Sequence, residues 1–181
     1  MKIAIIGTHG SGKTTLVYKL ASSLKENGYN VGIVEEVAAK CPFQINEGSS
    51  LESQLWIAYR QLIEELEKER KYEILITDRS IIDVYVYTIS MSRRKNFKLP
   101  KWLELLIEEH TKTYDIIFKT KLNKKFLKED GIRSTNPNWQ KEIEDIFNDV
   151  LKEKKISYYQ LPKRKQTKYM LKVIKNWKAK N

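Results

Sequence analysis

The chain has 181 residues, of which 41% are hydrophobic and 31% are charged. This length and composition predict one globular domain over residues 1–181 and exclude an intrinsically disordered chain. No apolar run is long enough to cross a bilayer, and the lone cysteine, Cys41, excludes an internal disulfide. We therefore expect a cytoplasmic protein with no membrane partner.

The net charge of +11 reflects an excess of lysine, with 27 lysines against 7 arginines. A basic surface can bind nucleic acid, but lysines spread along helix faces are more often simply solvated. A polynucleotide partner therefore stays open without being favoured. The sequence leaves a homodimer open as well.

Short apolar runs alternate along the chain with longer segments of helical periodicity. The runs predict five strands, over residues 2–6, 31–34, 74–77, 116–118 and 156–161. The longer segments predict six helices, over residues 13–27, 50–71, 80–92, 100–112, 138–154 and 164–179. This alternation indicates an α/β fold with a parallel sheet covered on both faces, which binds ligands at the carboxyl ends of its strands.

The first predicted strand is followed by a glycine-rich phosphate-binding sequence. Residues 7–15 read GTHGSGKTT and match the G-x-x-x-x-G-K-[ST] pattern of a P-loop. Glycines let successive backbone N–H groups point at phosphate oxygens, and the following helix adds the positive end of its dipole. We expect Lys13 to bind the β- and γ-phosphates of ATP, Thr14 to coordinate Mg2+, and His9 to pack within the loop. The predicted nucleotide-binding residues are Gly7, Gly10, Ser11, Gly12, Lys13, Thr14 and Thr15.

Charged side chains follow the second and third predicted strands. After the third strand, Asp78 could hold Mg2+ beside Thr14, and Arg79 could grip an anionic or hydroxyl-rich substrate. The alternative is that Asp78 caps the next helix and pairs with Arg79. Glu35 and Glu36 follow the second strand. Either could accept the proton of an attacking hydroxyl or bind the sugar of the substrate, and Glu36 is the preferred candidate. The alternative there is an exposed pair of loop acids.

The strand ends also argue against two classes of P-loop protein. Residues 123–126 read NKKF and lack the aspartate of the guanine-specific N-K-x-D sequence, and no D-x-x-G follows the third strand. A GTPase-like switch is therefore not expected. The third strand also lacks the adjacent acidic pair that is typical of motor ATPases, so a small-molecule kinase is the class that the strand ends favour.

These motifs together resemble those of the nicotinamide riboside kinase-like ATPases. That group includes the ribosylnicotinamide kinase domain of the bacterial NAD-biosynthesis regulator and lies within the thymidylate kinase-like and deoxynucleoside kinase-like class. The similar strings span nearly the whole chain: GTHGSGKTTL at 7–16, VEEVA at 34–38, DRS at 78–80 with Asp83 and Tyr87 beyond, YDIIF at 114–118 and EDGIR at 129–133.

The resemblance implies a five-stranded parallel sheet in the order 2-3-1-4-5, a substrate-binding helical region over residues 36–70 and a lid over residues 119–140. In the first region Gln54 is the expected substrate ligand, and Gln61 lies seven residues later on the same helix face. Exposed helix glutamines are the alternative. In the lid, Arg133 is the cation expected to close over the γ-phosphate, and it is a better candidate than the lysines around it.

The leading hypothesis is an ATP- and Mg2+-dependent kinase that phosphorylates a nucleoside, nucleotide or similar small metabolite. The expected catalytic residues are Lys13, Glu36, Asp78, Arg79 and Arg133. One rival is a regulatory NTPase that controls a protein partner, because Ala39, followed by Lys40, stands where similar proteins have an arginine. The other rival is a polynucleotide kinase or nucleic-acid-dependent ATPase, which the positive charge suggests.

Overall fold

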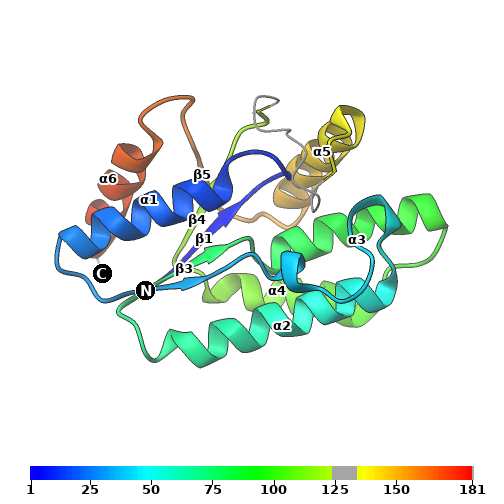
Figure 1. The fold of residues 1–181 in the computed structure, drawn as a ribbon, viewed down its shortest axis with the longest axis horizontal. Helices are drawn as coiled ribbons and strands as arrows, with labels where there is room; N and C mark the ends of the chain where they lie inside the picture. The colour runs from blue at the N-terminus through cyan, green and yellow to red at the C-terminus, as the bar shows by residue number, and fades with distance from the viewer. Residues whose placement is uncertain (124–133, 181) are drawn as a thin grey trace.

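A parallel five-stranded sheet forms the centre of the computed structural model, which describes residues 1–123 and 134–180 (Figure 1). Its strands are β1 (Lys2–Ile6), β2 (Val31–Val34), β3 (Ile74–Asp78), β4 (Ile116–Lys119) and β5 (Tyr159–Gln160). The α-helices of the described residues are α1 (Lys13–Glu26), α2 (Leu51–Glu69), α3 (Ile81–Lys95), α4 (Lys101–His110), α5 (Pro137–Glu153) and α6 (Gln166–Lys178). The strand order β2-β3-β1-β4-β5 confirms the predicted α/β fold.

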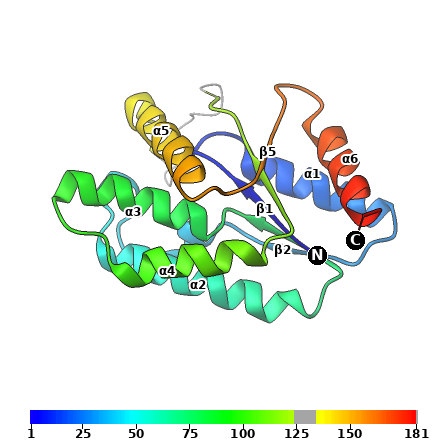
Figure 2. The same ribbon diagram turned by 180° about the vertical axis from the view of Figure 1, so that it is seen from behind.

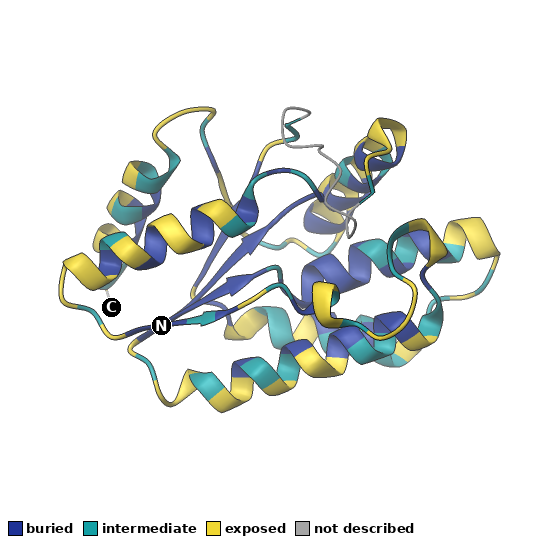
Figure 3. Ribbon diagram, in the orientation of Figure 1, coloured by how far each residue is buried: buried dark blue, intermediate teal, exposed yellow. Residues whose placement is uncertain are grey.

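The side chains of β1 alternate between two hydrophobic cores, one on each face of the sheet. Ile3 and Ile5 pack with α1 and α6, whereas Ala4 and Ile6 pack with α2, α3, α4 and α5. This period of two is that of a β-strand. Figures 1 and 2 show the two groups of helices on opposite faces, and Figure 3 shows that the central strands are buried between them. No described helix is long and apolar enough to cross a membrane.

The fifth strand is shorter than the sequence predicts, although the helix ends agree with prediction to three residues or fewer. Only Tyr159–Gln160 pairs with β4, and both residues are exposed at the edge of the sheet. Lys155 has a φ of 51°, so the chain turns just before this strand. Ile156 and Leu161 pack into the two cores on opposite faces instead. The apolar run at 156–161 therefore reflects burial on either side of a short strand.

A buried ionic network ties α2 to the start of the sheet and to α4. Glu65 is 0% exposed, and its Oε1 accepts hydrogen bonds from Gln61 (2.8 Å) and Tyr114 (2.7 Å). Its Oε2 lies 2.8 Å from His110 Nε2 and 3.3 Å from Lys2 Nζ. Burial by itself raises the pKa of Glu65, but the hydrogen bonds from His110 and Gln61 and the charge of Lys2 outweigh it and leave the pKa below its ordinary value. Gln61 therefore belongs to this network and not to a substrate site.

Replacing Glu65 with alanine is expected to lower the free energy of unfolding by about 3–5 kcal/mol, because it leaves several buried polar groups without their partner. Urea denaturation measures the loss. Glu64→Ala is the matched control, since its partners Arg60 and Lys68 are partly exposed, and its cost should stay below about 1 kcal/mol. Because the pKa of Glu65 is depressed by folding, its stabilisation holds above about pH 4.3 and is lost as the pH falls through the folded-state pKa. Equal costs for the two variants would contradict this account.

Candidate active site

The P-loop joins β1 to α1, and its glycines adopt backbone conformations that other residues disfavour. Gly7, Gly10 and Gly12 have φ values of 139°, 61° and 85°. A Cβ atom at Gly7 would lie 2.1 Å from the hydroxyl oxygen of Thr120, which follows β4, so a side chain there would clash. Gly12 precedes α1 without any side-chain cap, which leaves the first N–H groups of the helix available for phosphate.

The side chain of Lys13 folds back onto the P-loop. This side chain is 5% exposed, and Nζ donates hydrogen bonds to the backbone oxygens of Gly7 (2.8 Å) and Thr8 (2.7 Å). Burial and repulsion from Arg79 lower the pKa of Lys13 to about 8. A phosphate bound in the P-loop would place negative charge beside Lys13. It would therefore raise the pKa of Lys13 and favour its charged form.

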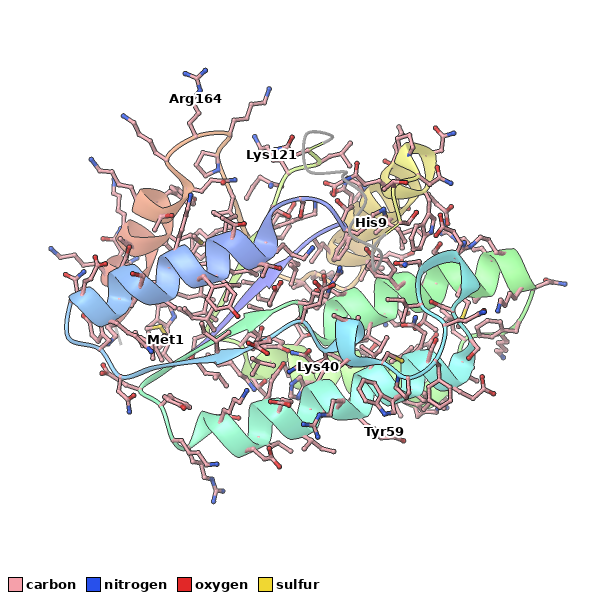
Figure 4. The ribbon with its side chains drawn as sticks, in the orientation of Figure 1. Met1, His9, Lys40, Tyr59, Lys121 and Arg164 are labelled. Carbon is pink, nitrogen blue, oxygen red and sulfur yellow. The ribbon has the colours of Figure 1, made fainter. Side chains whose placement is uncertain are left out.

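His9 anchors the P-loop to α3 and α5 (Figure 4). Its ring stacks on Trp139 with 4.7 Å between centroids, and the Tyr87 hydroxyl oxygen lies 2.9 Å from Nδ1 and accepts the backbone N–H of His9 at 3.0 Å. Gln140 Nε2 donates to the backbone oxygen of His9 at 2.8 Å. His9 is 1% exposed, which agrees with the packing role expected of it. Trp139 and Gln140 were missed in the sequence because no motif marks a loop support on a distant helix.

Asp78 and Thr14 meet at the end of the P-loop, as the sequence predicts. Asp78 is 1% exposed, and neither carboxylate oxygen has a hydrogen-bond partner of good geometry among the described residues. Burial raises the pKa of Asp78, against the lowering influence of Lys13 and of the nearby Thr14 hydroxyl. A buried carboxylate with unsatisfied oxygens beside a threonine hydroxyl fits Mg2+, which takes oxygen ligands from one or two such groups and completes its shell with phosphate and water. Ser80, and not Asp78, caps α3, so the capping alternative is wrong.

A second cluster of buried charges lies next to Lys13. Arg79 Nε donates to Glu36 Oε1 at 2.7 Å, and its Nη1 lies 3.7 Å from Asp83. Asp83 also accepts the backbone N–H groups of Gly7 (3.4 Å) and Ser80 (3.0 Å), so it ties the P-loop to α3. Burial raises the pKa of Asp83 to about 6, against the lowering influence of Arg79 and Lys13.

Arg79 has a φ of 78°, a backbone conformation that is rare for a residue with a side chain. Burial lowers the pKa of Arg79, but the charges of Glu36 and Asp83 outweigh it and hold the pKa well above its ordinary value. Such backbone strain concentrates at functional sites, because the surrounding structure must hold it in place. Arg79 is thus a strained, permanently charged residue that lines the pocket between α2 and α3.

Two pockets meet at Glu36. The first is the phosphate pocket, lined by Gly10, Ser11, Gly12, Lys13, Thr14, Thr15 and Glu36. The second lies between the chain after β2, α2 and α3, and we call it the acceptor pocket. Its lining residues are Glu36, Ala38, Ile45, Asn46, Ser49, Gln54, Ile57, Arg79, Asp83, Val84 and Tyr87. Glu36 therefore stands in the wall that the two pockets share.

Of the other predicted site residues, Gln54 lines a pocket, whereas Glu35 and Lys119 form ion pairs outside the two pockets. Gln54 lines the acceptor pocket and is 4% exposed, so the exposed-glutamine alternative is wrong. Its side-chain amide makes no hydrogen bond to any described residue. Glu35 is exposed and pairs at 3.0 Å with Lys40, which is also exposed. Lys119, a candidate lid lysine, is 0% exposed and pairs with Glu144.

The central part of the predicted lid, residues 124–133, lies outside the described part of the chain. Arg133 and the lysines at 124, 125 and 128 lie outside the described residues, so the role of Arg133 stays a prediction. Thr120, in contrast, was missed in the sequence. Its Oγ1 lies 2.8 Å from Ser11 Oγ and donates to the backbone oxygen of Ile6, directly beneath the P-loop. Its place at the carboxyl end of a strand was the only signal available.

Comparison with known proteins places this geometry in a family. A family model for AAA_28, described as an AAA domain, matches residues 2–168. A search of curated proteins finds no significant match. Among solved structures, deoxyadenosine kinase from M. mycoides with bound dATP aligns at a TM-score of 0.72 and 17% identity, over 97% of this chain and 99% of that chain. The same enzyme with bound dCTP aligns at a TM-score of 0.71 and 17% identity, over 97% of this chain and 100% of that chain.

A third structure of that enzyme, with the products dCMP and a flexible dCDP, aligns at a TM-score of 0.68 and 17% identity over 100% of both chains. At this identity the likeness establishes the fold alone, a kinase-like P-loop fold. The narrower resemblance to nicotinamide riboside kinase-like ATPases stays a prediction. Because the family model covers most of the sequence, the chain belongs to the AAA_28 family of AAA domains.

Proposed function

We propose that the chain is an ATP- and Mg2+-dependent phosphotransferase that acts on a nucleoside, a nucleotide or a related small metabolite. The observation that carries the proposal is the position of Glu36 in the wall shared by the phosphate pocket and the acceptor pocket. A carboxylate between a phosphate donor and a second, partly apolar pocket is where a kinase needs a group that accepts a proton from the acceptor hydroxyl.

The phosphate pocket supplies the donor half of the reaction. Lys13 and the N–H groups at the start of α1 would hold the β- and γ-phosphates, with charge rather than covalent chemistry stabilising the transferring group. Thr14 and Asp78 would hold Mg2+. When bound, that ion neutralises charge that develops on the phosphate oxygens.

The lining of the acceptor pocket offers both apolar and polar groups to an acceptor. Ala38, Ile57 and Val84 provide apolar walls, and the buried amide of Gln54 offers both a donor and an acceptor to the edge of a base. Arg79 and Glu36 lie at the end of the pocket nearest the P-loop. They are placed to bind the hydroxyl-bearing part of the acceptor by hydrogen bonds.

In the proposed reaction the acceptor hydroxyl oxygen attacks the γ-phosphorus of ATP and forms the new P–O bond. The bond from the γ-phosphorus to the bridging oxygen breaks, ADP leaves, and the hydroxyl proton passes to Glu36. Arg79 holds Glu36 in place through their 2.7 Å hydrogen bond and orients the acceptor. Catalysis then rests on positioning and on stabilisation of charge.

The decisive experiment measures ADP release from ATP and Mg2+ across a panel of nucleosides, nucleoside monophosphates and nicotinamide riboside, with mass spectrometry of the products. We expect one class of acceptor to stimulate turnover strongly and to appear phosphorylated. Slow hydrolysis that is indifferent to every acceptor would contradict the proposal and would favour a regulatory NTPase.

Replacing Asp78 with asparagine is expected to raise the Mg2+ concentration needed for half-maximal turnover by roughly 10- to 100-fold, because the buried anionic ligand is lost while its shape is kept. A Mg2+ titration of turnover at saturating ATP measures the shift. Asp145→Asn is the control, since Asp145 is exposed on α5 and pairs with Lys141. An unchanged Mg2+ requirement in Asp78→Asn would remove Asp78 from the proposed metal site.

A further inference from the structure

The positive charge of the chain is concentrated in its last 21 residues. Residues 161–181 contain eight basic residues and no acidic residue, so they carry +8 of the net charge of +11. The preceding 160 residues are nearly balanced, with 26 basic and 23 acidic residues. Half of these eight basic residues lie on α6, and the others flank it.

The lysines of α6 differ from those of α2 and α5, where carboxylates on the same helix pair with lysines. Lys68 pairs with Glu64 on α2, and Lys141 pairs with Asp145 on α5, each within one helical turn. The α6 segment has no such partners within it. Lys178 reaches Glu73 at 2.6 Å, but no ion pair with a described residue forms at Lys163, Arg164, Lys165, Lys168, Lys172 and Lys175.

These cations surround a surface groove, which we call the α6 groove. Its lining residues are Pro162, Arg164, Lys165, Lys168, Tyr169, Leu171, Lys172 and Lys175. Five of the eight are cationic and none is acidic, whereas Tyr169 and Leu171 are only partly buried and give the groove an apolar surface. The cations from Lys165 to Lys175 follow one side of the helix over about 15 Å, taking 1.5 Å of rise per residue.

The groove starts at the same edge of the sheet as the nucleotide site. The loop from β5 to α6 leaves the carboxyl end of β5, which runs parallel to β4 and β1. Figure 4 shows Arg164 on this loop and Lys121, after β4, projecting from the same edge of the molecule. A polyanion bound along α6 would therefore extend from the rim of the P-loop site down the outside of the protein.

The apolar face of α6 decides between two kinds of polyanion. Met170, Val173 and Ile174 are buried against α1, in the same core as Leu16 and Leu20. A helix that binds a membrane surface needs a free apolar face to insert between lipids, and α6 has already buried its own. A single-stranded nucleic acid needs only a line of cations with an aromatic ring on which a base can stack, and the groove offers both.

We propose that the α6 groove binds the backbone of a single-stranded polynucleotide. Lys165, Lys168, Lys172 and Lys175 contact successive phosphates, and Tyr169 stacks on a base. Lysine provides point charges without the bidentate geometry of arginine, so the site recognises the strand without reading a particular sequence. The proposal concerns a surface outside the phosphate and acceptor pockets and stands independently of the proposed phosphotransfer.

The test is fluorescence anisotropy of a labelled oligothymidylate of about 20 nucleotides, with the full chain, at increasing salt. If the four lysines neutralise four phosphates, affinity should fall roughly 50-fold between about 50 and about 200 mM salt, as counterion release requires. The triple variant K168Q/K172Q/K175Q should weaken binding at low salt by at least about 10-fold, and its affinity should fall only about 3-fold over the same salt range.

The control is K95Q/K98Q/K101Q, which removes the same charge from exposed lysines at the end of α3, in the following loop and at the start of α4. It should bind the oligonucleotide nearly as tightly as the unmodified chain, and thermal melting should show that both variants remain folded. An unmodified chain that does not bind, or a control that loses as much affinity as the groove variant, would overturn the proposal. So would binding to phosphatidylserine vesicles, sensitive to the groove variant, without binding to the oligonucleotide. A Lys13→Ala variant should keep its oligonucleotide affinity, which separates this test from that of phosphotransfer.

Discussion

Replacing Lys13 with alanine is expected to lower kcat/KM for phosphoryl transfer by at least about 100- to 1,000-fold. Lys13 is the buried cation of the phosphate pocket, and its ammonium group now rests on the backbone oxygens of Gly7 and Thr8. Phosphate would replace these contacts by a stronger, charge-assisted hydrogen bond. The variant keeps the loop glycines but has lost the cation that would stabilise negative charge on the γ-phosphoryl group during transfer. Steady-state ADP release with the acceptor identified by the panel measures the loss.

The matched control for this variant is Lys19→Ala, which removes an exposed lysine from the same helix, about one turn beyond the P-loop. Its turnover should stay within about twofold of the unmodified chain, since surface charges on one helix have small effects. Removing Lys13 also leaves two carbonyl groups without their donor, so thermal unfolding of both variants must accompany the kinetics. A folded Lys13→Ala variant with near-normal turnover would contradict the assignment of the phosphate pocket.

Glu36→Gln is expected to lower kcat by about 100- to 10,000-fold while the KM for ATP changes little. The amide keeps the shape of the side chain and an oxygen for Arg79, but it cannot accept the proton of the acceptor hydroxyl. The phosphate pocket is otherwise intact, because its remaining lining residues come from the P-loop and the start of α1. The measurement is a full kinetic analysis with both ATP and the acceptor varied.

Glu35→Gln provides a neighbouring control, since Glu35 is exposed and pairs with Lys40 and the Tyr18 hydroxyl at the surface. This variant should keep its kcat within about twofold, as expected for a weak surface pair. If instead the Glu36 variant loses ATP affinity with an unchanged kcat, Glu36 helps to bind the donor and another group takes the proton. If both variants lose kcat equally, the proposed division between the two glutamates is wrong.

The sequence alone determined the position of the P-loop and the order of the elements around it. The pattern at residues 7–15 depends only on local backbone geometry and on the helix that follows, so spacing along the chain is enough to recognise it. The alternation of apolar runs and helical periods likewise predicts the parallel sheet, because strands buried on both faces have a local signature. The fifth strand was overestimated because burial beside a strand leaves the same apolar pattern as the strand itself.

Only the tertiary structure decided which charged groups meet. Glu36 and Arg79 are 43 residues apart in the chain and hydrogen-bonded in the fold, and no spacing rule distinguishes Glu36 from its neighbour Glu35. Gln54 and Gln61 share a helix face in the sequence, yet one lines the acceptor pocket and the other joins a buried network. These differences come from the packing of α2 against the sheet, α3 and α4. A side chain becomes part of a site only through neighbours that are distant in sequence, and those neighbours are set by the way the helices pack.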